Sequence, residues 1–180
     1  MRKRKGLLFA TILALVLLTD FYLFGLSIVA FGWHMRHGFH QEVHGFRFNV
    51  PLFYEEGDGV KANSFSIYSY ACPLRKKSSS LSIDFPPWSS DRTLTPMSKD
   101  NAQRMGLGLL GQRSARFANR TGKCIEYLQQ GIPALSLGHS EMELMWITCQ
   151  FGDVGANFNG TRNAVPEFYQ FLESAQEVKR

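Results

Sequence analysis

Charged side chains are almost missing from the first part of this chain. Asp20 is the only Asp, Glu, Lys, Arg or His between Gly6 and Trp33, a run of 28 mostly apolar residues. At a rise of about 1.5 Å per residue, a helix of this length exceeds the roughly 30 Å of hydrocarbon in a bilayer. Residues 1–5 carry four cations, which favour the cytoplasmic side. We therefore expect a cytoplasmic basic tail (1–5), a transmembrane anchor (6–33) and an extracytoplasmic remainder.

A removable secretory signal is the alternative interpretation, because basic residues before an apolar segment also begin signal peptides. The run continues well past the roughly 7–15 apolar residues of a signal-peptide core. The small-x-small tripeptide near its end, Ala30-Phe31-Gly32, carries a bulky Phe, and the run has no Cys for lipidation. We therefore expect the segment to be retained as the signal anchor of a single-pass membrane protein.

Asp20 is the polar exception inside this run. A carboxylate near the bilayer centre costs roughly 2.5–3.5 kcal/mol on insertion scales, which the surrounding apolar residues outweigh. Asp20 either pairs with a cation or polar group on another transmembrane helix, or is protonated or displaced toward one interface. Both interpretations stay open on the sequence.

An excess of basic charge is missing from the rest of the chain. The net charge of +5 and the pI of about 9.2 arise mainly from residues 1–5. Beyond Trp33 there are 16 Lys and Arg against 14 Asp and Glu, so we expect no nucleic-acid partner. The length suits one domain. We place an α+β domain at 45–180, after a His-rich juxtamembrane segment at 34–44.

Cysteine is scarce, with Cys72, Cys124 and Cys149 only. An odd number allows at most one intramolecular bridge. Cys124 and Cys149 lie in two strand-like stretches 25 residues apart, which is compatible with a disulfide between neighbouring strands. Two free, buried thiols are the alternative, and Cys72, beside Pro73, is the expected unpaired residue.

Complete catalytic and cofactor motifs are also missing. Gly106 to Gly111 has the spacing of a dinucleotide-binding loop, but no hydrophobic strand precedes it and no βαβ unit follows. His139 and Ser140 begin like a nucleophile elbow, but Met142 stands where that motif needs Gly. We therefore expect no cofactor and no enzyme, with a membrane-tethered hydrolase using Ser140 and His139 as the alternative.

Four of the five histidines, by contrast, are concentrated in eleven residues: His34, His37, His40 and His44. On a continuous helix, their spacing would place all four within about 120° of its surface. Such imidazoles could bind a metal ion or respond to pH. The alternative is an amphipathic juxtamembrane segment, because Gly38 weakens the helix and Trp33, Met35 and Phe39 suit a membrane interface. We assign no metal site.

The remaining chain has clear periodicity. Alternating polar and apolar residues predict strands, which we place at 45–51, 64–70, 81–85, 114–118, 122–129 and 141–150, with 154–157 as a hairpin partner. A helix is predicted at 98–111, with Ala102, Met105, Leu109 and Leu110 inside. A second helix follows Asn163 as N-cap and carries an apolar stripe containing Phe168 and Phe171. The predicted class is α+β, with both helices packed on an antiparallel sheet.

The order of these elements resembles a known family. A first strand at Phe46–Pro51, two more strands, a mid-chain helix, and further strands ending in Phe158-Asn159-Gly160 before the helix at Phe168–Leu172 are similar to the Mog1/PsbP-like α/β/α sandwich. The resemblance covers most of residues 45–178 and carries no diagnostic motif, so no functional residue is transferred. It implies a non-catalytic binding or assembly module, whose partner would be an extracytoplasmic protein or ligand.

One loop differs from the rest in composition. Phe85-Pro86-Pro87-Trp88 combines prolines with Trp88. Such a loop presents an exposed contact surface, with Pro86, Pro87 and Trp88 as its residues, or it places Trp88 over the sheet edge.

Overall fold

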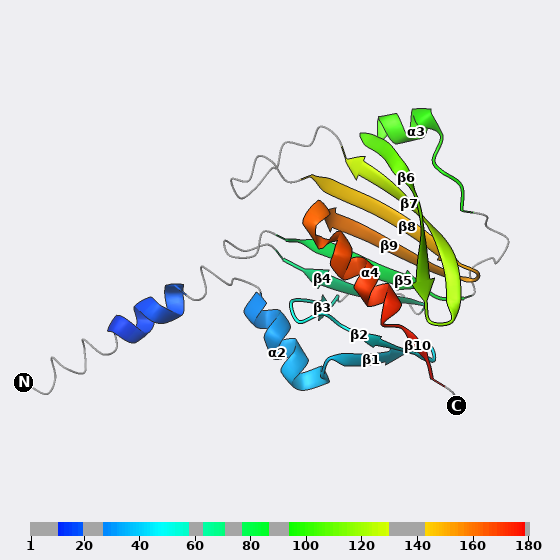
Figure 1. The fold of residues 1–180 in the computed structure, drawn as a ribbon. Coiled ribbons are helices and arrows are strands. Elements are labelled where there is room, and N and C mark those ends of the chain that lie inside the picture. The colour runs from blue at the N-terminus through cyan, green and yellow to red at the C-terminus, as the bar shows by residue number, and fades with distance from the viewer. Residues whose placement is uncertain are drawn as a thin grey trace, which may run out of the picture.

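The computed structural model describes residues 11–19, 27–57, 63–70, 77–86, 94–129 and 143–178. Within these residues the chain is an α+β protein with two antiparallel sheets (Figure 1). The larger sheet has the strand order β3-β4-β5-β9-β8-β7-β6, and the smaller has the order β1-β2-β10. The strands are β1 His40–Val43, β2 Phe46–Asn49, β3 Glu55–Glu56, β4 Ser64–Ser69, β5 Ser79–Asp84, β6 Leu107–Phe117, β7 Arg120–Gln129, β8 Leu144–Phe151, β9 Val154–Thr161 and β10 Gln176–Glu177.

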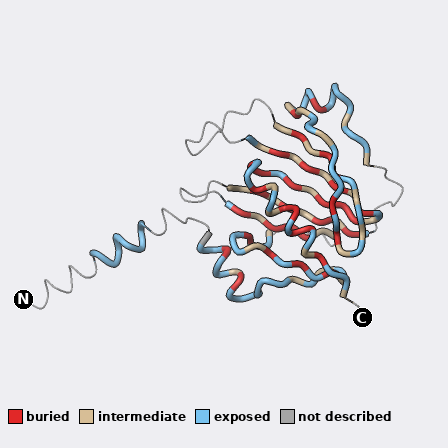
Figure 2. The backbone as a smooth tube through the Cα atoms, viewed as in Figure 1, coloured by how far each residue is buried: buried red, intermediate tan, exposed pale blue. Residues whose placement is uncertain are grey.

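The large sheet follows the alternation of the sequence. In β8, Met145, Ile147, Cys149 and Phe151 are buried and alternate with less buried residues, as Figure 2 shows along the central strands. Successive side chains of a strand point to opposite faces. One face of the large sheet therefore forms the main core. Each predicted strand overlaps a strand of the structure. The strand predicted at 114–118 already begins at Leu107, and the last strand extends to Thr161.

Helix α4, Val165–Glu173, lies across this face (Figure 1). Phe168, Phe171 and Leu172 are at most 1% exposed, so the predicted apolar stripe and its packing on the sheet are confirmed. The predicted N-cap is wrong. Asn163 lies inside a 3-10 turn, Arg162–Ala164, and Ala164 precedes the helix without a side-chain cap.

The predicted helix at 98–111 is much shorter in the structure. Helix α3 is Lys99–Arg104, capped by Ser98, whose side chain accepts a hydrogen bond from Asn101 N. Gly106 has a φ of +65°, which ends the helical path, and β6 begins at Leu107.

The inner-face assignment for this helix is correct only for Ala102, which is buried. Met105, Leu109 and Leu110 are 45%, 52% and 48% exposed. The pairing with β7 explains the difference. The backbone of residues 107–117 is hydrogen-bonded to β7 as a strand, with a bulge between Leu109 and Gly111, so these residues cannot be helical.

Part of the segment 34–44 belongs to the small sheet. Residues 34–44 were expected to form a juxtamembrane segment outside the domain, but β1 lies within them and pairs with β2. Gly38, with a φ of +76°, separates β1 from helix α2, Ser27–His37. On its other edge β2 pairs with β10, so both ends of the domain meet at one strand.

The predicted anchor is described in two pieces. Residues 11–19 are helical, and α2 covers the end of the run. In the part of the chain that the structure describes, no helix has both the length and the apolar character needed to cross a membrane. Asp20 lies outside the described residues.

Candidate functional site

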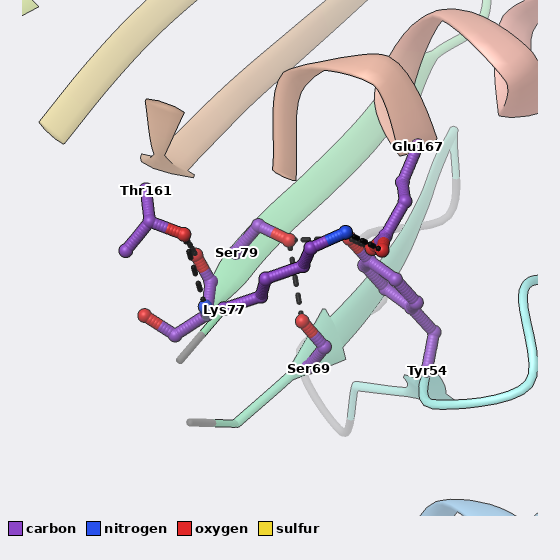
Figure 3. Close-up of polar contacts among 7 residues, drawn as sticks. Tyr54, Ser69, Lys77, Ser79, Thr161 and Glu167 are labelled. Atoms are coloured by element: carbon purple, nitrogen blue, oxygen red, sulfur yellow. Dashed lines mark hydrogen bonds and ion pairs between the residues drawn. The ribbon is translucent and has the colours of Figure 1, made fainter. Parts of the chain in front are cut away.

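A buried cluster of polar side chains forms where the end of β4 meets the start of β5 (Figure 3). Ser69 and Ser79 are paired in the β4–β5 register, and their hydroxyl oxygens lie 3.2 Å apart. Tyr54 enters from the turn before β3 and places its hydroxyl oxygen 2.5 Å from Ser79 Oγ. The Tyr54 hydroxyl also donates to Glu167 Oε2 at 3.0 Å, which connects the turn to the first turn of α4.

Two further contacts lie beside the cluster. Lys77 Nζ donates to Glu167 Oε1 at 2.9 Å, with the two side chains 36% and 21% exposed. Thr161, at the end of β9, accepts from Ser78 N at 3.2 Å through its Oγ1. The cluster therefore joins the start of α4, the end of β9, the β4–β5 pair and the turn before β3.

The groups of this cluster have the chemistry of a structural hydrogen-bond network that links strands, turn and helix. The pKa of Tyr54 is raised to about 12, chiefly by burial and in part by the nearby Glu167 charge, against a lowering by the Ser79 hydrogen bond. Tyr54 is therefore a proton-bearing donor at neutral pH. The hydrogen-bond partners of Ser79 within the described residues are two hydroxyl groups, and neither is a general base.

Helix α2 is attached to the domain by a second polar contact. His34 is 3% exposed, and its Nε2 lies 3.0 Å from Pro51 O while its Nδ1 lies 3.1 Å from Gly38 O. Its ring stacks on Phe39 at 4.6 Å between centroids. Ala30, one turn earlier, is 2% exposed. The end of the predicted anchor is therefore part of the folded domain.

The four clustered histidines do not share a helix face, because the condition of a continuous helix through residues 34–44 is not met. Gly38 ends α2, and the residues after it belong to a strand and a turn. His37 contacts Trp33 O, His40 Nδ1 lies 2.7 Å from Asn49 Oδ1, and the His44 ring lies 4.7 Å from that of Phe85. In the described ranges, which include all four, no group of three or more His, Cys, Asp or Glu is arranged to bind a metal ion.

The predicted cysteine pair is bonded. Cys124 in β7 and Cys149 in β8 are directly opposite in the register, with Cα atoms 4.0 Å apart, and a disulfide joins them. Both residues are fully buried in the main core. The alternative of two free thiols is therefore wrong for this structure, and Cys72 lies outside the described residues.

The other predicted sites are only partly described. Ser140 and His139 lie outside the described residues, and so do Pro87 and Trp88 of the contact loop. Pro86 is exposed, directly after the buried Phe85.

None of the residues of the Tyr54 cluster was predicted. The partners of Tyr54, Ser79 and Glu167, lie 25 and 113 residues further along the chain, so no local pattern indicates them.

The fold defines an α+β protein in which α4 closes the core and a helix from the apolar N-terminal run docks beside it. No family model matches the chain, and no curated protein matches it. Among solved structures, the solution structure of cyanobacterial PsbP (CyanoP) from Synechocystis sp. PCC 6803 is similar, with a TM-score of 0.44 and 14% identity over 77% of this chain and 91% of that chain. The expected fold-level resemblance to the PsbP-like family is thus borne out by the comparison.

Proposed function

We propose that the chain is a membrane-anchored binding or assembly module whose α+β domain lies outside the cytoplasm. The observation that carries the proposal is the helix at residues 11–19, in which every residue is exposed. Its large apolar side chains are between 48% and 66% exposed. A helix that is apolar on all sides needs a hydrophobic surrounding, and lipid supplies it.

Three further features support this location. Thr19 Oγ1 donates to Leu15 O at 2.8 Å, so the hydroxyl is satisfied within its own helix, as hydrocarbon requires. The Cys124–Cys149 disulfide is typical of oxidising compartments outside the cytoplasm. The four cations of residues 1–5 favour the same orientation.

The binding part of the proposal is supported by the edge of the large sheet at β6. In the described residues β6 has a strand neighbour on one side only, and Leu109 and Leu110 are exposed on it. A pocket of about 400 Å³ lies beside them, with Met97, Ala102 and Leu107 in its lining. Exposed apolar residues beside a free strand edge are typical of protein contact surfaces.

Membrane extraction of the full-length protein tests the anchor. We expect the wild type to remain in the membrane pellet after alkaline carbonate, and external protease to digest the domain in intact cells. Leu13→Arg with Leu17→Arg should release the protein, because each Arg near the bilayer centre costs roughly 2.5–3.5 kcal/mol. The matched control is Asn119→Arg with Gln170→Arg, at exposed positions of the domain. A carbonate-soluble wild type, or a protease-protected domain, would reject the proposal.

Asp20 provides a separate test of assembly within the membrane. Asp20→Leu removes the costly carboxylate, so insertion should be unchanged, whereas a complex formed by pairing with another transmembrane helix should weaken. The measurement is co-purification in mild detergent. A complex of unchanged strength would reject the pairing role for Asp20.

A further inference from the structure

Helix α2 has an apolar side that the domain does not cover. Ile28, Phe31 and Met35 are 48%, 53% and 74% exposed. With Gly32, they follow the spacing i, i+3, i+4 and i+7, which places them on one side of a helix. A Cβ added at Gly32 would meet no atom within 4 Å, so this side is open along its length.

The opposite side of α2 is docked. Ala30 and His34 are almost fully buried, and α2 packs against β3. The chain leaving α2 is held as well, because Val50 N donates to Phe39 O at 2.9 Å. A helix docked on one side normally has a polar outer side facing water. In α2 the outer side is apolar.

The sequence that precedes α2 indicates what covers the outer apolar side of this helix. The chain from Gly6 into α2 is an apolar run with a single charged residue. The outer stripe of α2 therefore prolongs the apolar surface of the proposed anchor. Arg36, exposed in the last turn, gives the stripe a charged border, and such residues extend toward lipid headgroups. These features fit a bilayer interface.

We infer that α2 lies at the outer surface of the bilayer, with Ile28, Phe31 and Met35 in lipid and the domain fixed to its other side. This inference rests on the proposed membrane anchor. Under this inference, the domain is held against the membrane through α2 and is not connected to the anchor by a flexible linker. His34 and Pro51 set its orientation, so one face of the domain is always turned to the membrane.

Fluorescent probes on the full-length protein in phosphatidylcholine vesicles test the inference. A Cys72→Ser background leaves only the disulfide cysteines, and single cysteines then replace Leu15, Met35 or Asn119. Each is labelled with an environment-sensitive fluorophore and exposed to a nitroxide-bearing lipid. Asn119, exposed in the β6–β7 turn, is the control in water.

We expect quenching at Leu15 and Met35 to exceed that at Asn119 by at least about threefold, since an interfacial helix places its apolar side roughly 5–10 Å into the boundary layer. If the probe at position 15 is quenched but the probe at position 35 is quenched no more than that at position 119, the inference about α2 is overturned and the anchor still stands. No quenching at Leu15 would overturn the anchor itself. A Phe31→Cys probe repeats the measurement if the Met35 variant does not fold.

Discussion

Helices α2 and α4 are of similar length and both pack on the domain, but they do so in different ways. In α4 the apolar residues Phe168, Phe171 and Leu172 are inside and Gln170 faces out. In α2 Ala30 and His34 are buried and Trp33 is partly buried against the core, while Ile28, Phe31 and Met35 face out. α4 therefore supplies hydrophobic free energy to the core. α2 contributes less, through Ala30 and the partly buried Trp33, and is also held by the polar contacts of His34, while its outer apolar side stays uncovered by the described residues.

The largest expected effect separates the two helices directly. Phe171→Ala in α4 should lower the free energy of unfolding by about 3–5 kcal/mol, because it removes a fully buried aromatic ring. Phe31→Ala, the matched change on the outer side of α2, should change it by less than about 0.5 kcal/mol. Denaturant unfolding in detergent measures both. Equal losses of unfolding free energy in the two variants would show that α2 and α4 contribute to the core in the same way, against the prediction.

The next effect concerns the sheet beneath α4. Replacing Cys124 and Cys149 together by Ala should destabilise the domain by about 3 kcal/mol, as expected for a bridge closing a loop of 25 residues. Thermal unfolding with and without a reducing agent measures the loss. Reduction should destabilise the wild type and leave the double variant unaffected; a wild type indifferent to reductant would contradict the prediction.

A smaller effect is expected at the docking contact of α2. His34→Ala removes a buried hydrogen-bonding ring and should weaken docking by about 1–2 kcal/mol. The loss should appear as faster amide exchange in α2, with exchange in α4 unchanged. His37→Ala, on the same helix but exposed, should change little. Faster exchange in both helices would show that α2 is part of the main core.

The smallest effect is at Tyr54. Tyr54→Phe removes the hydroxyl shared with Ser79 and Glu167 and should cost about 1 kcal/mol at neutral pH. Burial raises the pKa of Tyr54 from 10.0 to about 12, so the protonated form is favoured in the fold. Its contribution is complete below pH 10 and is lost as the pH rises from 10 to about 12. A stability difference between wild type and Tyr54→Phe that stays constant across this range would contradict the prediction.

The parts of the fold that follow local rules were predictable from the sequence. β8 and α4 have strong periodicity, and their buried sides are those that the pattern indicates. The predicted helix at 98–111 was wrong beyond residue 104. The apolar residues there fit both a helical and a strand period, and Gly106 and the pairing with β7 select the strand. β1, β3 and β10 are at most four residues long and are stabilised by pairing, which carries little sequence pattern.

The site was less predictable than the fold. The Cys124–Cys149 pair was accessible, because each cysteine lay in a recognisable strand. The role of His34 was not, because it depends on the carbonyl of Pro51, 17 residues away, and on the helix ending at Gly38. The Tyr54 cluster combines residues from four elements, and no local spacing brings them together.

The turn from Pro51 to Tyr54 has a consequence for how the molecule responds to its surroundings. Its first residue accepts from His34 of α2, its last reaches Glu167 of α4, and Tyr54 N donates to Pro51 O at 2.9 Å to close it. Four residues thus connect helix α2 to helix α4, which seals the core. Because this turn contacts both helices, a displacement of α2 would be transmitted to the start of α4, and the two helices cannot shift independently without breaking one of these hydrogen bonds.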